Sequence, residues 1–234
     1  SSRPDVPDAR DATIVGLNKL VCTMLNRLSR VPWPEAPAQK EAPRTDAPID
    51  VLIVVCSPAR APLPKAFDEA HALASTVRRA GCTAHILEPG GAAAINALLP
   101  KRSPRVVWFI GHGDATHPTN KRRTLALTAE GRAVEYMQPK TLVDIFGGAS
   151  PRLELVVLNS CQSAASDGGL PSLCEAISRG YHVPTVGWRT IAADTAAQIF
   201  AIGLMGCLAP QLAQGPRLSC SAVADAFEAG ERAV

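Results

Sequence analysis

The segments RVVWFIGH (residues 105–112) and LELVVLNSC (residues 153–161) decide how the chain folds. Each is an almost unbroken run of β-branched and aliphatic residues, which is the pattern of a strand buried on both faces of a sheet. Each run also ends on a chemically reactive side chain, His112 in the first and Cys161 in the second. The two segments therefore predict the centre of a sheet and a place where chemistry can occur.

Three further apolar runs predict strands: DVLIVVC (50–56), TAHIL (83–87) and PTVGW (184–188). Between and after the strands lie stretches with apolar residues at helical spacing, over 65–80, 92–99, 139–146, 169–180, 194–208 and 220–229. Residues 124–138 have the pattern of a small hairpin. The alternation of strands and helices predicts an α/β fold, with a parallel sheet covered by helices on both faces.

The N-terminal part of the chain has a different organisation. Residues 11–30 carry apolar side chains at helical spacing, so residues 1–30 are predicted to form a helical appendage. Residues 31–49 contain five prolines, which exclude a continuous helix or a central strand and predict an extended linker. We expect the main domain to span residues 50–234.

The composition excludes several classes of protein. Lys and Arg number 24 against 21 Asp and Glu in 234 residues, too small an excess to predict a surface for nucleic acid or a membrane. Three Trp, two Tyr and five Phe are too few to predict stacking platforms for single-stranded nucleic acid. The seven cysteines contain no CxxC pair and lie mostly in apolar segments, which predicts reduced thiols in a cytoplasmic protein. The longest apolar run, 199–209, is too short to cross a bilayer.

The positions of His112 and Cys161 predict a reactive site. Ligands of parallel sheets bind beyond the carboxyl ends of the strands, where these two side chains would emerge together if their strands are neighbours. A Cys thiolate is a nucleophile, and a nearby His can take the thiol proton and later protonate a leaving amine. Gly113 would let the backbone approach a substrate, and its N–H and that of Cys161 could hold an oxyanion.

Each of these residues also has an ordinary structural interpretation. A Cys that ends a buried strand is commonly inert packing, and GHG is commonly a turn with flanking glycines. The two residues in this order, with the His about 50 residues upstream of the Cys, favour the catalytic interpretation over the structural one.

Three stretches resemble the CHAT peptidases: VVWFIGHGD (106–114), LELVVLNSCQSA (153–164) and GLPSLCEAISRGYHVPTVGWRT (169–190). CHAT peptidases are caspase-like cysteine proteases related to separase, in the clan of caspases and gingipains. The resemblance implies a caspase-like three-layer sandwich, with a mostly parallel six-stranded sheet and helices on both faces. It implies a Cys–His dyad at Cys161 and His112, with the oxyanion hole at the N–H groups of Gly113 and Cys161. The sixth strand would have to lie near residues 211–219.

The resemblance also suggests residues that select the P1 side chain of a substrate, the residue whose carbonyl group is attacked. Trp188, Arg189 and Thr190 lie at the end of the fifth strand, where caspase-like chains pair with an extended substrate, although Trp188 could equally fill the core. Asp194 resembles the separase-like acid that binds a basic P1 residue, and it could equally cap the following helix. Arg189 points instead to an acidic P1 residue. Metacaspases carry an acid two residues before the cysteine, where this chain has Asn159.

We therefore expect a cysteine endopeptidase that cleaves specific protein substrates in a regulated defence, signalling or cell-death pathway. An activating partner or an upstream sensor domain would control it. The alternative is a catalytically silent caspase-like scaffold that binds peptides. We expect no cofactor and no direct binding of nucleic acid or membrane. No metal site is expected either, because His112 and His117 form an H-x4-H pair that no carboxylate or cysteine completes.

Overall fold

The computed structural model describes residues 47–116, 123–147, 152–166 and 171–234. The predicted appendage (1–30) and residues 31–46 of the predicted linker lie outside these ranges. Ile49, which the sequence pattern places in the linker, is 2% exposed, and its N–H donates to the carbonyl oxygen of Arg102 at 2.9 Å. Ile49 therefore belongs to the core of the main domain and not to the linker.

The main sheet consists of parallel strands in the order β2–β1–β3–β7–β8. They are β1 (Val51–Val55), β2 (Ala84–Leu87), β3 (Val106–Ile110), β7 (Leu155–Asn159) and β8 (Thr185–Gly187). All five correspond to apolar runs that predicted strands. Every residue of β1, β3 and β7 is buried, as expected for strands with helices on both faces.

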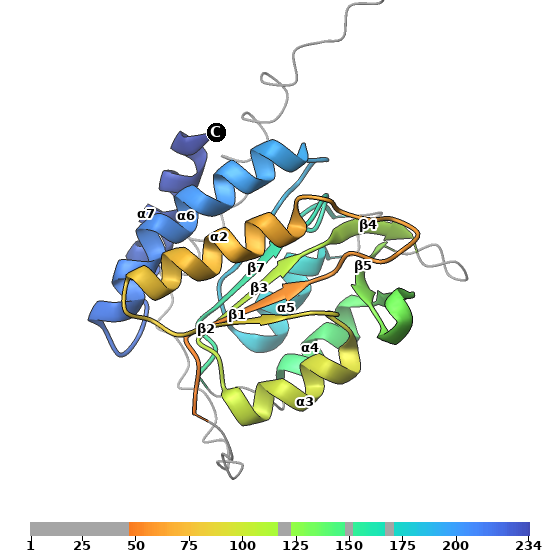
Figure 1. Ribbon diagram of the computed structural model, residues 1–234, viewed down its shortest axis with the longest axis horizontal. Coiled ribbons are helices and arrows are strands. Elements are labelled where there is room, and N and C mark those ends of the chain that lie inside the picture. Colours follow the sequence, from red (N-terminus) through yellow and green to blue (C-terminus); the bar gives the residue numbers. More distant parts are fainter. Residues whose placement is uncertain (1–46, 117–122, 148–151, 167–170) are drawn as a thin grey trace, which may run out of the picture.

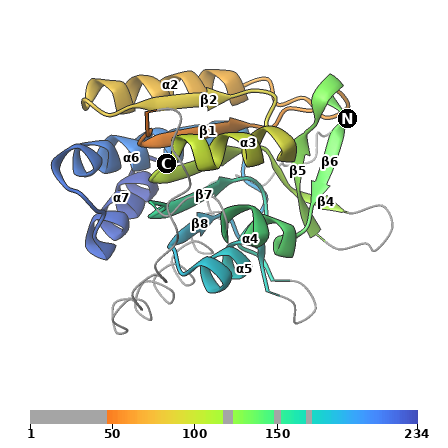
Figure 2. The same cartoon turned by 90° about the horizontal axis from the view of Figure 1, so that it is seen from below.

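Helices cover both faces of this sheet (Figures 1 and 2). On one face lie α2 (Ala66–Arg79), α6 (Asp194–Gln214) and α7 (Cys220–Ala233), and on the other α3 (Ala92–Arg102), α4 (Pro139–Gly147) and α5 (Leu173–Tyr181). Alternate side chains of each central strand enter opposite cores: Trp108 packs with the first helix layer, whereas Phe109 packs with the second. The predicted α/β fold is confirmed.

The main sheet differs from the expected six strands. Within the described ranges it has five, and residues 211–219 contain the end of α6 and the turn into α7 instead of a strand. A small antiparallel sheet is present in addition, formed by β4 (His112–Thr116), β5 (Arg123–Thr128) and β6 (Val134–Met137), with the short helix η1 (Glu130–Arg132) between the last two. The hairpin predicted over 124–138 is thus confirmed.

Helix α6 is longer than the apolar run in the sequence suggested. It has 21 residues and is long and apolar enough, by length and composition alone, to cross a membrane. In the structure its buried side chains, including Phe200, Leu204 and Leu208, form part of the core beside α2 and α7.

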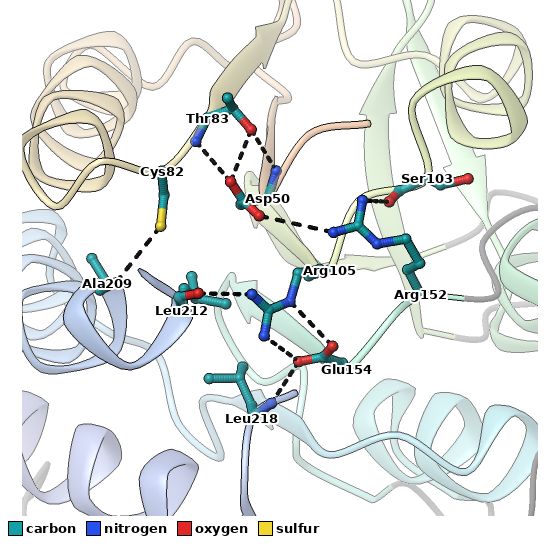
Figure 3. Close-up of polar contacts among 10 residues, drawn as sticks. All are labelled: Asp50, Cys82, Thr83, Ser103, Arg105, Arg152, Glu154, Ala209, Leu212 and Leu218. Carbon is teal, nitrogen blue, oxygen red and sulfur yellow. Dashed lines mark hydrogen bonds and ion pairs between the residues drawn. The ribbon is translucent and has the colours of Figure 1, made fainter. Parts of the chain in front are cut away.

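Polar contacts fix α6 to the edge of the sheet that lies opposite the carboxyl ends of the strands (Figure 3). Arg105, which is 4% exposed, donates to both carboxylate oxygens of Glu154 at 3.1 Å each and to the carbonyl oxygen of Leu212 at 2.8 Å. Glu154 also accepts the backbone N–H of Leu218 at 2.7 Å. The network thus connects the beginnings of β3 and β7 to the end of α6 and the turn that follows it.

Replacing Arg105 with methionine is expected to lower the free energy of unfolding by about 3–5 kcal/mol, because it leaves the largely buried Glu154 carboxylate without its cation. Urea denaturation would measure this loss. Arg232→Met is the matched control, because the Arg232–Glu228 ion pair is exposed and contributes less than about 1 kcal/mol. Equal losses in the two variants would contradict the assigned role of Arg105.

Candidate active site

The carboxyl ends of β3 and β7 meet at one edge of the sheet, as expected from the sequence. The two strands are parallel neighbours, and Ile110 is paired in register with Asn159. His112 lies two residues after Ile110, and Cys161 lies two residues after Asn159. The topology therefore brings an imidazole and a thiol to the same edge, although 48 residues separate them in the chain.

A pocket of about 280 Å³ opens at this edge. Its walls come from the ends of β3 and β7, the loop after β1, the start of α2 and the segment that leads from β8 into α6. Six of the residues that line it carry the chemistry discussed below: Glu69, His112, Asn159, Cys161, Trp188 and Asp194.

The imidazole of His112 is held by the loop between β1 and α2. Its Nε2 lies 3.0 Å from the backbone carbonyl oxygen of Ala61. Because a carbonyl can only accept a hydrogen bond, Nε2 carries the proton in this contact. In the neutral ring Nδ1 is then unprotonated, which is the state that a general base requires.

The loop that carries Cys161 is fixed to the segment after β8. The Sγ atom lies 3.7 Å from the carbonyl oxygen of Ala192. The N–H of Gln162 donates to the Thr190 carbonyl at 3.0 Å, and the N–H of Ala164 donates to the Trp188 carbonyl at 2.8 Å. These two hydrogen bonds join the cysteine loop to one side of the segment 188–190.

Gly113 packs directly against the cysteine loop. A Cβ atom at this position would lie 2.5 Å from the carbonyl oxygen of Cys161 and 2.7 Å from Oγ of Ser160, closer than side-chain atoms approach. The absence of a side chain therefore lets the two loops meet. Gly113 is not itself among the residues that line the pocket.

Trp188 fills the core, one of the two interpretations that the sequence left open, and it also lines the pocket. Its ring is 2% exposed and packs edge-on against Phe200 at a centroid distance of 5.2 Å, so it belongs to the core. It also lines the pocket, and its indole N–H donates to Oδ1 of Asn159 at 2.6 Å. Arg189, the next residue, is exposed and is not part of the pocket wall.

Asp194 lines the pocket but does not cap α6. The N-cap residue is Ala193, and Asp194 is the first residue of the helix. The alternative interpretation of Asp194 as an N-cap is therefore wrong, because its backbone is already helical. A carboxylate in the first turn still interacts favourably with the helix dipole.

Glu69 is a pocket residue that the sequence analysis missed. It lies on α2, is 4% exposed, and its Oε1 accepts a hydrogen bond from Nδ2 of Asn159 at 2.7 Å. The signal was a Glu on the apolar face of a helix, since Ala66, Ala70 and Leu73 are buried beside it. Its partner is 90 residues away in the sequence, so the pattern alone could not identify the contact.

Burial raises the pKa of Glu69 from 4.5 to about 7. The hydrogen bond from Asn159 and the nearby Trp108 indole lower this pKa, and the negative charge of Asp194 raises it. Between pH 4.5 and 7 the folded state therefore binds one more proton than the unfolded state. The contribution of Glu69 to the free energy of unfolding is present below this window and is lost as the pH rises through it.

We expect Glu69→Gln to remove this pH dependence, because glutamine is neutral throughout. Relative to the unsubstituted protein, the variant should gain about 2–3 kcal/mol of stability on going from pH 5 to pH 8. Urea denaturation at the two pH values measures the difference, with the exposed Glu228→Gln as the control. Parallel pH dependences for Glu69→Gln and the unsubstituted protein would show that Glu69 does not titrate in this way.

The pocket has the groups for nucleophilic and acid–base chemistry. Within the ranges that the structure describes, no three His, Cys, Asp or Glu side chains gather closely enough to hold a metal ion. Two other thiols, those of Cys56 and Cys174, are buried, and burial raises the pKa of each to about 12. They are therefore poor nucleophiles at neutral pH.

Fold and pocket together define an α/β domain with a cysteine and a histidine at the carboxyl edge of a parallel sheet. The family model of the CHAT domain matches residues 19–177, more than half of the chain. The chain belongs to the CHAT domain family, which is a caspase-like family. The match includes His112 and Cys161 and ends before Trp188, Arg189 and Asp194. No curated protein matches the chain.

Proposed function

We propose that the protein is a cysteine endopeptidase, with Cys161 as the nucleophile and His112 as the general acid and base. The observation that carries the proposal is that both side chains line one pocket, at the ends of two strands paired in register. Membership of a caspase-like family supports the same chemistry.

The reaction would proceed in two steps. Nδ1 of His112 takes the proton of the Cys161 thiol, and Sγ attacks the carbonyl carbon of the P1 residue. The tetrahedral intermediate collapses when the peptide C–N bond breaks, and His112 returns the proton to the leaving amine. A water molecule, deprotonated by His112, then hydrolyses the thioester and restores the free thiol.

The backbone N–H groups of Gly113 and Cys161 are the proposed oxyanion hole. The close packing of Gly113 against the cysteine loop supports this assignment, because it keeps the two backbone segments adjacent. Trp188 and Asp194 would contact the substrate from the pocket wall. Arg189, which is exposed beyond the pocket, would contact a more distant part of the peptide.

The proposal extends to the cellular setting. Substrates would be specific proteins of a regulated defence, signalling or cell-death pathway in the cytoplasm. An activating partner, or a sensor domain upstream of the peptidase domain, would control the activity.

Labelling with a peptide acyloxymethyl ketone tests the proposal. Such a probe reacts with a cysteine that is both nucleophilic and placed to receive a peptide. We expect Cys161 to be modified, and the other six cysteines to remain unmodified, when tryptic peptides are mapped by mass spectrometry. The buried Cys56 and Cys174 are internal controls for an intact fold.

Two results would contradict the endopeptidase proposal. Modification of several cysteines at similar rates would show that Cys161 has no special reactivity. No modification of Cys161, together with measurable binding of the same peptide without the reactive group, would favour the catalytically silent scaffold.

A further inference from the structure

The charges of the pocket favour a positively charged substrate group. Glu69 and Asp194 contribute two carboxyl groups, and among the lining residues that the structure describes the one Lys or Arg is Lys65. The Lys65 ammonium donates to Oγ1 of Thr195 at 2.8 Å, at an exposed position. Arg189, which could have attracted an acidic side chain, is not part of the wall.

Glu69 is the buried acid of this pocket. No ion pair within the described part of the chain neutralises it. A buried carboxylate without a cation is unfavourable, and a cation that enters the pocket with a substrate would remove that cost. Asp194, by contrast, is exposed where α6 begins.

Neighbouring side chains hold the Glu69 carboxyl group in a defined orientation. The indole N–H of Trp188 can only donate, so the Asn159 amide must present its oxygen to Trp188. This leaves the amide nitrogen of Asn159 to face Glu69, as the 2.7 Å contact shows. Asn159 lies two residues before Cys161 on the same segment. The hydrogen bond from Asn159 therefore positions the Glu69 carboxyl group relative to the proposed nucleophile.

We propose that Glu69 determines specificity by binding the ammonium or guanidinium group of a basic P1 side chain. The inference rests on the proposed endopeptidase function and names its substrate class. The end of β7 carries the neutral Asn159, two residues before Cys161. Glu69 of α2, which is hydrogen-bonded to Asn159, would supply the negative charge at this place.

The electrostatic surroundings of Glu69 agree with this assignment. Its raised pKa reflects burial, and the groups that face the pocket with it are Asp194, Lys65, His112 and Asn159. An entering cation favours the ionised carboxyl group and so lowers the pKa again. A charge-assisted hydrogen bond then forms in a site partly shielded from water.

The experiment compares acyloxymethyl ketone probes that differ only at P1, carrying lysine, arginine, norleucine, glutamine or aspartate. Norleucine has an aliphatic chain like that of lysine but no ammonium group. The measurement is the second-order rate of Cys161 labelling in the unsubstituted protein, in Glu69→Gln and in the control Glu228→Gln. The ratio of the lysine rate to the norleucine rate cancels any general loss of reactivity in a variant.

We expect this ratio to be about 10–100 in the unsubstituted protein and in Glu228→Gln, and to fall by about tenfold or more in Glu69→Gln. A ratio near one, a preference for glutamine or aspartate, or an unchanged ratio in Glu69→Gln would overturn the specificity assignment while Cys161 labelling still supported the endopeptidase. Failure of every probe to label Cys161 would overturn both.

Discussion

Replacement of Cys161 with alanine should reduce peptide cleavage by about 10⁴-fold or more, because the proposed mechanism has no other nucleophile. The fold should persist. The hydrogen bond from the thiol to the Ala192 carbonyl is long, at 3.7 Å, and its loss should change the free energy of unfolding by less than about 1 kcal/mol. Cleavage of a mixed peptide library, read by mass spectrometry, measures the activity.

Cys207→Ala is the matched control. Cys207 is a partly buried thiol on α6 that is not part of the pocket wall, so its loss should leave cleavage unchanged. Cleavage by Cys161→Ala at a rate close to that of the unsubstituted protein would exclude Cys161 as the nucleophile, provided that the control variant behaves in the same way.

Replacement of His112 with alanine should lower kcat by about 10²–10⁴-fold, because the thiol then lacks its general base and the leaving amine lacks its acid. The change should fall on kcat with little effect on KM, since the imidazole acts on the reacting atoms. Added imidazole should restore part of the activity by occupying the space left by the side chain.

His71→Ala is the control for this variant, because His71 is an exposed residue of α2. The loss of the contact with the Ala61 carbonyl could also loosen the loop after β1. Imidazole rescue separates the two effects, because a displaced loop would not be repaired by free imidazole. Unchanged kcat in His112→Ala would remove His112 from the mechanism.

The order of the main strands and helices followed from the sequence because buried parallel strands leave a simple pattern. The runs at β1, β3 and β7 are apolar throughout, since helices cover both of their faces. Strand β4 was not predicted, because HGDAT has no alternating or continuous apolar pattern. It is a strand because its backbone pairs with β5, and a pattern within five residues does not reveal that pairing.

The end of α6 shows how tertiary contacts override local preference. The predicted helix ended at residue 208, two residues before Pro210, and proline is unfavourable inside a helix. The structure continues to Gln214. Leu212 packs into the core and its carbonyl oxygen accepts a hydrogen bond from Arg105, and both contacts come from residues distant in the sequence.

In the site, too, local sequence patterns predicted some residues, whereas others depend on tertiary contacts. His112 and Cys161 were predicted to lie together if their strands are neighbours, because ligands of parallel sheets bind at the carboxyl ends of the strands, and β3 and β7 are neighbours in the structure. Glu69 could not be assigned, because its place beside Asn159 depends on how α2 packs over the ends of the strands. The open alternatives at Trp188 and Asp194 likewise required the observed helix start and the observed packing against Phe200.

The most direct measurement is a crystal structure of the protein after reaction with the lysine-containing acyloxymethyl ketone. We expect a covalent bond from Sγ of Cys161 to the probe, with the His112 ring on the same side of the pocket and within about 2.6–3.2 Å of a polar atom of the adduct. The lysine ammonium should lie at Glu69. A probe attached to another cysteine, or an adduct on Cys161 that His112 faces away from, would contradict the proposed mechanism.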